Sequence, residues 1–171
     1  ARGKAWQRDE RPKGSGNSPR RNCPGRVQHE MRMVDHGVRK ADGTVAKVQR
    51  AEDDVNIEFQ SRSKYAADAE KLAWAFADAN EKYAADYPAQ VGRHMTNTDS
   101  SPFMDIVPAI SLRENERGAQ IGDGWDPQWH QPTDVYSFYT DNDFRLGLNA
   151  AQTTLGDVAT LQGARVGGTA H

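Results

Sequence analysis

The stretch Asp105-Ile106-Val107-Pro108-Ala109-Ile110-Ser111-Leu112 decides the fold class that this sequence predicts. Its apolar residues follow one another with little polar alternation, which is typical of a β-strand covered on both faces. Such a strand belongs inside a sheet with a layer packed on either side. Pro108 has no backbone N–H, so we expect irregular pairing or a bulge at that position.

A first helix is expected over residues 61–86, before this strand. Apolar residues recur there at intervals of three and four, which places them on one stripe of a helix. Ser61 or Ser63 is expected to cap the helix and Pro88 to end it. The predicted buried stripe consists of Tyr65, Ala69, Leu72, Ala73, Phe76 and Tyr83.

A second helix is expected to begin at Thr140. Asp143 follows three residues later, in an arrangement like a capping box. Gly163 stands where such a helix is expected to end. The predicted buried face consists of Phe144, Leu148, Ala151, Leu155 and Val158.

Shorter β-elements are expected in the first third of the chain. Residues 27–34 and Val55–Phe59 have the composition of strands, and residues 38–48 form a predicted hairpin around the Asp42-Gly43 turn. Strands, helix, strand, long loop and helix in this order indicate an α/β domain. We expect a three-layer arrangement around a mixed sheet.

Composition divides the chain into unequal parts. The 171 residues suffice for one core, and the mean hydropathy of −0.87 is low. Residues 1–26 hold eight of the 22 Lys and Arg but two of the 24 Asp and Glu. We therefore expect a flexible basic leader over 1–26, a domain over 27–165 and a flexible tail over 166–171.

The composition also limits the classes of function. The single cysteine, Cys23, excludes an internal disulfide framework and a thiolate zinc cage. The leader lacks the interleaved aromatic residues that stack on bases, so no specific nucleic-acid partner is expected. No run approaches the ~18 apolar residues of a membrane span, and no membrane partner is expected. The cellular location stays open.

Two motifs point to hydrolytic chemistry. The first is Trp129-His130-Gln131-Pro132-Thr133-Asp134, and the second is Thr98-Asp99-Ser100-Ser101-Pro102-Phe103. Together with the strand after the second motif, they resemble the closing segment of the co-catalytic zinc aminopeptidases and carboxypeptidases (clan MH, family M twenty-eight). The resemblance extends over about residues 27–164.

This resemblance implies roles for individual residues. Gln28-His29-Glu30-Met31 matches the family's strand that carries a zinc-binding carboxylate, which makes Glu30 a metal ligand. His130 corresponds to the family's last metal-binding histidine, and Asp99 lies in its loop beside the substrate pocket. The family's upstream ligands and its Glu-Glu pair have no counterpart here, so the chain resembles the C-terminal half of such a peptidase.

The sequence contains further residues suited to a metal. His36 lies an even number of residues after Glu30, so both side chains would point to the same face of a continuous strand, whereas His29 would point to the opposite face. A site of Glu30, His36, His130 and Asp99 with an open position for water is therefore admissible. A different arrangement, in which His130 and Asp134 activate Ser100, Ser101 or Ser111, lacks a nucleophile elbow.

Two functions are consistent with these observations. One is a zinc-dependent hydrolase in which metal-bound water attacks an amide or, more readily, an activated ester or phosphoester. The cofactor would be one or two zinc ions, bound by one chain or shared between subunits. The substrate would be a small molecule or a peptide. The other function is that of an inactive peptidase remnant acting as an assembly module. A truncated sheet exposes an edge and an apolar face, so a homodimer or higher homo-oligomer is expected.

Overall fold

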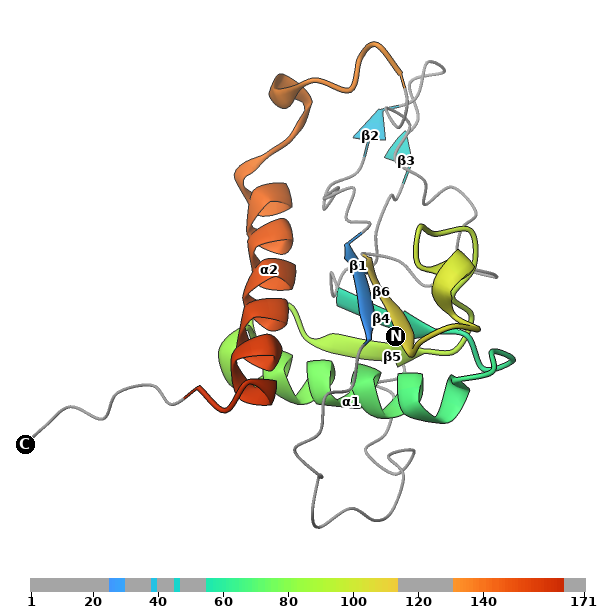
Figure 1. The fold of residues 1–171 in the computed structure, drawn as a ribbon. Coiled ribbons are helices and arrows are strands. Elements are labelled where there is room, and N and C mark those ends of the chain that lie inside the picture. Colours follow the sequence, from blue (N-terminus) through green and yellow to red (C-terminus); the bar gives the residue numbers. More distant parts are fainter. Residues whose placement is uncertain (1–24, 30–37, 40–44, 47–54, 114–130, 165–171) are drawn as a thin grey trace, which may run out of the picture.

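The computed structural model describes residues 25–29, 38–39, 45–46, 55–113 and 131–164. Figure 1 shows a sheet with two long helices beside it. The strands are β1 (Arg26–His29), β2 (Val38–Arg39), β3 (Val45–Ala46), β4 (Val55–Phe59), β5 (Ala89–Gly92) and β6 (Ala109–Arg113). The α-helices are α1 (Ala66–Tyr83) and α2 (Asp141–Leu161), and the short 3₁₀ turns are η2 (Ser101–Phe103) and η3 (Tyr136–Phe138).

The main sheet is mixed, as the sequence predicts, and its strand order is β1-β6-β4-β5. The central strands β4 and β6 are antiparallel, while β1 pairs with β6 and β4 pairs with β5 in parallel. Every residue of β4 and β6 is buried. This confirms a strand covered on both faces for Ala109–Leu112. Residues 105–108 were predicted in the same strand, but they form turns and irregular backbone before it, so Pro108 lies just outside the sheet instead of at a bulge within it. The separate pair β2-β3 is antiparallel, which confirms the predicted hairpin.

One face of the sheet forms the apolar core. Ile57 of β4 pairs with Leu112 of β6, so both side chains point to the same face. Helix α1 packs on them through its own apolar stripe, and Leu146 of α2 completes the cluster. Both helices therefore lie on the same side of the sheet. The core consists of Val55, Ile57, Phe59, Ala69, Leu72, Ala73, Phe76, Ile110, Leu112, Leu146 and Ala150.

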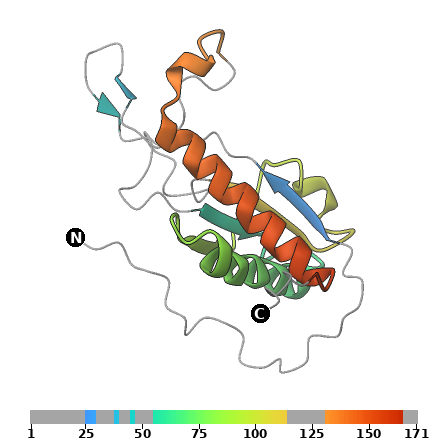
Figure 2. The ribbon, with the colours of Figure 1, turned by 90° about the vertical axis from the view of Figure 1, so that its left-hand side faces the viewer.

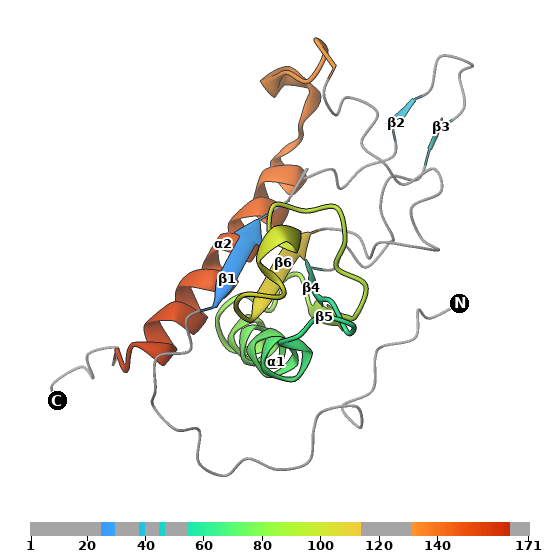
Figure 3. The same cartoon turned by 45° about the vertical axis from the view of Figure 1, so that its right-hand side comes forward.

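The opposite face is covered without an α-helix in the described part of the chain. Residues 94–108, named the covering segment from here on, cross this face and contain η2 (Figure 3). Met95 and Ser100 of the segment are completely buried. The α/β class and the mixed sheet are thus confirmed. The expected three-layer arrangement differs, because the third layer is an irregular segment held by hydrogen bonds.

Helix α1 is shorter than the sequence predicts. It begins after Tyr65 without a side-chain cap and ends at Tyr83, so neither Ser61 nor Ser63 is its N-cap. The residues before it form turns that are joined to other elements, for example through the Lys64 N–H, which donates to Asp105 at 2.7 Å. Strand β5 follows Pro88 and was not predicted, because only four residues form it.

Helix α2 begins where predicted, but the side that was predicted to be buried faces solvent. Thr140 and Asp143 form a complete capping box, and Gly163 adopts φ +72 just beyond the end. The predicted buried face is wrong, since Leu148 and Leu155 are 57% and 70% exposed. The side that meets α1 and the sheet is mostly polar. It consists of Asp143, Leu146, Asn149, Ala150, Thr153 and Asp157.

The reason for this orientation is a buried amide network centred on Asn80 of α1. Its Nδ2 lies within 3.0–3.1 Å of four acceptors, two of which are Asn149 Oδ1 and Thr153 Oγ1 of α2. Its Oδ1 accepts from the Ala89 N–H at 2.8 Å. Asn149 Nδ2 donates to the Ala84 carbonyl at 2.6 Å. One side chain thus connects α1, β5 and α2.

No described helix is long and apolar enough to cross a membrane.

Replacing Asn80 with alanine is expected to lower the free energy of unfolding by about 2–4 kcal/mol, since it leaves the buried Ala89 N–H and several acceptors without their partner. Chemical denaturation measures this change. Asn142→Ala is the matched control, because Asn142 is an exposed asparagine on α2. Equal losses for the two variants would contradict the structural role of Asn80.

Asp157 makes stability depend on pH. It is buried between the helices, and its Oδ2 has no hydrogen-bond partner within the described residues. Loss of solvation, and secondarily the charge of Asp78, raises the pKa of Asp157 from 3.8 to about 6. The folded state therefore holds this proton more tightly than the unfolded state. Its contribution to stability is fully present below pH 3.8 and is lost as the pH rises through about 6.

Asp157→Asn is expected to remove this component, so that the variant gains stability over the wild type at about pH 7.5 but not at about pH 4. Thermal melting at the two pH values measures the difference. Asp86→Asn, at an exposed aspartate, controls for the change in net charge. If the stability of Asp157→Asn changes between the two pH values as much as that of the wild type does, the pH dependence arises from other groups.

Candidate functional site

The second face of the sheet is polar although it is buried. Asn56 and Glu58 alternate with the core residues of β4, and Ser111 and Arg113 do the same on β6. The register pairs Glu58 with Ser111, and Gln28 of β1 with Ser111 from the other side. A row of polar side chains therefore crosses three strands beneath the covering segment.

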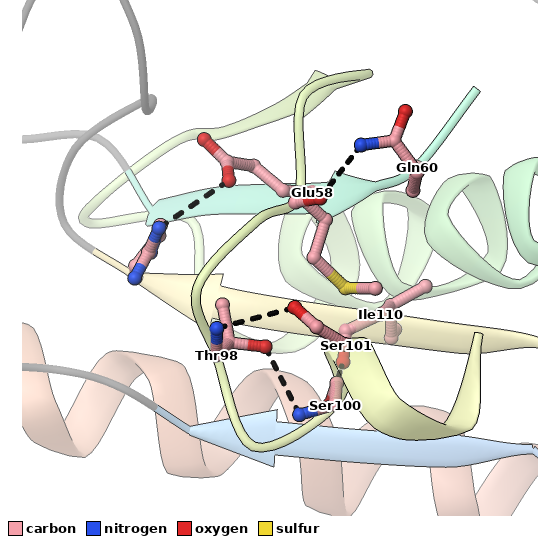
Figure 4. A network of polar contacts seen from close by, with 8 residues as sticks. Glu58, Gln60, Thr98, Ser100, Ser101 and Ile110 are labelled. Atoms are coloured by element: carbon pink, nitrogen blue, oxygen red, sulfur yellow. Dashed lines mark hydrogen bonds and ion pairs between the residues drawn. The ribbon is translucent and has the colours of Figure 1, made fainter. Parts of the chain in front are cut away.

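An ion pair forms the centre of this row. Arg113 Nη1 lies 3.6 Å from Glu58 Oε2, and both side chains are almost completely removed from solvent. Figure 4 shows Glu58 of this pair beside the covering segment. Charges in such surroundings are costly to separate, because water cannot replace the missing partner. The pair therefore fixes β4 and β6 relative to each other on the polar face.

Short hydrogen bonds hold the covering segment on the sheet. Ser100 Oγ donates to the Ile110 carbonyl of β6 at 3.1 Å, and the Ser100 N–H donates to Thr98 Oγ1 at 3.0 Å (Figure 4). The Thr98 N–H donates to Ser101 Oγ at 3.2 Å. Gln60 Nε2 donates to the Met95 carbonyl at 2.9 Å. The Thr-Asp-Ser-Ser motif is thus first of all a folded turn.

This turn places Asp99 beside β1. Gln28 Nε2 donates to Asp99 Oδ2 at 3.4 Å, and the carboxylate is exposed. Nearby, the Arg26 guanidinium lies 4.3 Å from the centre of the Phe103 ring. Two motifs that lie 71 residues apart in the sequence therefore meet at this position.

Strands β1 and β6 end at the same edge of the sheet. They are parallel, and His29 at the end of β1 pairs with Leu112, the penultimate residue of β6. The carboxyl ends of neighbouring parallel strands are the usual place for ligand sites in α/β folds. Glu30 is the next residue in the sequence after β1, and Glu114 is the next after β6.

The imidazole of His29 points to the helical side of the sheet. Its Nε2 lies 2.6 Å from Thr154 Oγ1 of α2. Loss of surrounding water lowers the pKa of His29 below its ordinary value of 6.5. His29 and Gln28 therefore face opposite sides of β1, in agreement with the predicted parity of this strand.

The structure bears on two of the three serines in the serine-based alternative. Ser100 and Ser111 are completely buried, so neither hydroxyl can meet a substrate. Ser100 Oγ is also engaged by the Ile110 carbonyl. Asp134, the expected partner of His130, accepts a hydrogen bond from Tyr139 Oη at 2.7 Å. Ser101 is only half-buried and His130 lies outside the described residues, so the arrangement with Ser101 stays a prediction.

The predicted metal ligands are not positioned by the structure. Glu30, His36 and His130 lie outside the described residues. Within the described ranges, no group of three or more His, Cys, Asp or Glu side chains is arranged to hold a metal ion. Asp99 is the one predicted site residue whose position is described. A zinc site would therefore need ligands from segments beyond these ranges.

No family model, curated protein or solved structure matches this chain.

Sequence reasoning missed the buried pair of Glu58 and Arg113. The signal was present in Val55-Asn56-Ile57-Glu58-Phe59, whose strict alternation indicates one apolar and one polar face. A polar face is ordinarily expected to meet water. No pattern in the sequence predicts the covering segment, so the burial of this face is known only from the structure.

Glu58→Ala is expected to lower the free energy of unfolding by about 3–5 kcal/mol, because it removes a carboxylate from a buried cation. The double variant Glu58→Leu/Arg113→Leu is expected to recover a large part of that loss. Denaturation of the three proteins measures both effects. Asp68→Ala is the control, since it breaks the exposed pair with Lys71 at 3.1 Å and is expected to cost about 1 kcal/mol or less.

A double variant as unstable as Glu58→Ala would show that the carboxylate acts through some other contact than the ion pair.

Proposed function

We propose that this protein is a zinc-dependent hydrolase related to the co-catalytic zinc exopeptidases. The contact between Gln28 and Asp99 carries the proposal. In the resembling family, the strand with the zinc-binding carboxylate and the Ser-Asp-x-x-Pro-Phe loop serve the same catalytic centre. The corresponding segments of this chain are joined by that hydrogen bond.

The position of the contact supports the role proposed for Glu30. Gln28 points to the side of the sheet occupied by the covering segment, where Asp99 lies. Glu30 follows Gln28 by two residues and has the same strand parity. The exposed Asp99 carboxylate is therefore available to a substrate group.

The common edge of β1 and β6 supports the role proposed for His130. His130 follows Arg113, the last residue of β6, in the sequence, as Glu30 follows the last residue of β1, and these two strands are parallel neighbours. The buried ion pair of Arg113 with Glu58 fixes the end of β6. Glu30, His36 and His130 would hold the metal, which supplies a water molecule of lowered pKa when it is bound.

The residues of this chain have distinct tasks in the proposed reaction. Asp99 orients the substrate by accepting a hydrogen bond, while Gln28 holds the carboxylate in place. No Glu-Glu pair provides a general base. Substrates with good leaving groups need less proton transfer, so activated esters and phosphoesters are the preferred class over amides.

Metal analysis combined with an ester assay tests the proposal. The purified full chain is expected to contain zinc and to hydrolyse 4-nitrophenyl acetate, to lose this activity on chelation, and to regain it when zinc is added. His130→Ala is expected to lower kcat/KM by about 100-fold or more, since even partners behind a metal ligand contribute ten- to hundredfold.

His94→Ala is the matched control, because His94 is an exposed histidine outside the two motifs. Absence of zinc, together with turnover that is unchanged in His130→Ala, would overturn the hydrolase. The remaining function would then be that of a catalytically inactive assembly module.

A further inference from the structure

Helix α2 exposes the apolar side that its sequence would be expected to bury. Leu148, Leu155, Val158 and Leu161 are 57%, 70%, 44% and 51% exposed. The inner side is occupied by the network around Asn80, which requires amides and hydroxyls from α2. The outward apolar stripe therefore does not contribute to the core of its own subunit. Figure 2 shows α2 lying across the helical side of the molecule.

The exposed stripe has the spacing of a helix-pairing seam. Phe144, Leu148, Ala151, Leu155 and Val158 are separated by four, three, four and three residues. This is the alternation of a and d positions in a heptad repeat. Such a seam buries its side chains most completely against another helix with the same spacing.

The same surface is free of exposed charge from Leu146 onward, while Asp141 and Arg145 are exposed at its amino-terminal end. Asp157 is the one ionisable residue among residues 146–164, and it is buried on the inner side. A partner that relies on charge would find no complement on this surface. A partner that also presents an uncharged apolar helix would bury no charge, which agrees with the depletion of charged residues at interface cores.

Aromatic side chains extend the stripe at its amino-terminal end. The Tyr136 ring stacks on Phe144 with centroids 5.3 Å apart, and Tyr136 is itself 80% exposed. Val135 beside it is 48% exposed. Exposed aromatic and aliphatic groups of this kind mark association surfaces when they are contiguous.

We propose that a second copy of this chain packs on the exposed stripe of α2. The stripe is bordered by no exposed charge from Leu146 onward, and the helix that matches it in spacing is α2 itself. A two-fold symmetric pair uses the same surface twice and forms a closed dimer. This proposal is independent of the proposed hydrolase, because it uses none of the residues assigned to that site.

The residue sizes along the stripe favour an antiparallel pair centred on Ala151. A two-fold axis at Ala151 places Phe144 opposite Val158 of the second copy, and Leu148 within one residue of the level of Leu155. The small Ala151 then lies where the two helices approach each other most closely, between larger side chains on both sides. The antiparallel arrangement also places the oppositely charged ends of the helix dipoles together.

Sedimentation equilibrium of the full chain tests the interface. The wild type is expected to be a dimer at micromolar concentration, and Leu155→Glu to weaken association by about 30-fold or more, because a charge replaces a central apolar contact. Leu155 is exposed, so the variant should retain the wild-type circular dichroism and melting temperature. Ile106→Glu is the control, since Ile106 is 63% exposed in the covering segment on the other face of the sheet.

Disulfide trapping tests the geometry separately. In a Cys23→Ser background, Ala151→Cys is expected to form a covalent dimer under mild oxidation, because the two-fold axis brings the two thiols together. Ala67→Cys, at an exposed alanine of α1, is expected to remain monomeric on non-reducing gels. Trapping of Ala67→Cys as fast as Ala151→Cys would overturn the proposed geometry.

A wild type that sediments as a monomer at every concentration would overturn the proposal. So would a monomer that binds neutral phosphatidylcholine vesicles through Leu155, since the stripe would then be occupied by lipid. A dimer that Leu155→Glu leaves intact would also contradict it, because the contact would lie elsewhere on the molecule. These results do not depend on metal content or ester hydrolysis, so the hydrolase and the dimer succeed or fail separately.

Discussion

The pairing of β4 with β6 is the constraint on which the rest of the structure depends. Both strands are buried on both faces, and their register sorts apolar residues to one side and polar residues to the other. The apolar side requires a layer that excludes water, which α1 and α2 provide. The polar side is closed off by the covering segment, which is attached through Ser100 Oγ to the Ile110 carbonyl and through Asp99 to Gln28. A single strand pair therefore demands two chemically different coverings.

Local patterns of the sequence predicted the elements better than their packing. The strand Val55–Phe59 and the capping box at Thr140 agree with the structure because short-range hydrogen bonding and alternation determine them. The start of α1 and the strand β5 were not predicted, since tertiary contacts fix them. The orientation of α2 was predicted wrongly. Hydrophobic periodicity identifies the apolar side of a helix, but it does not say whether that side meets the core or another subunit.

The candidate site illustrates the same limit. The motif around Asp99 and the Gln-His-Glu-Met segment were singled out separately from their residues, and the hydrogen bond between Asp99 and Gln28 is known only from the structure. The ion pair between Glu58 and Arg113 was not anticipated, because each residue resembles an ordinary solvent-facing strand position. Its burial results from a long-range crossing of the chain. Such crossings leave no periodic trace in a single sequence.

The amide network that orients α2 has a thermodynamic consequence. A helix docked largely through Asn149 and Thr153 covers less apolar surface than one docked through leucines. Detachment of α2 from α1 would therefore expose little hydrocarbon to water. Opening reactions of this kind have a weak dependence on denaturant and a small change in heat capacity. Amide hydrogen exchange in α2 should accordingly respond to temperature through broken hydrogen bonds, while urea accelerates it only slightly.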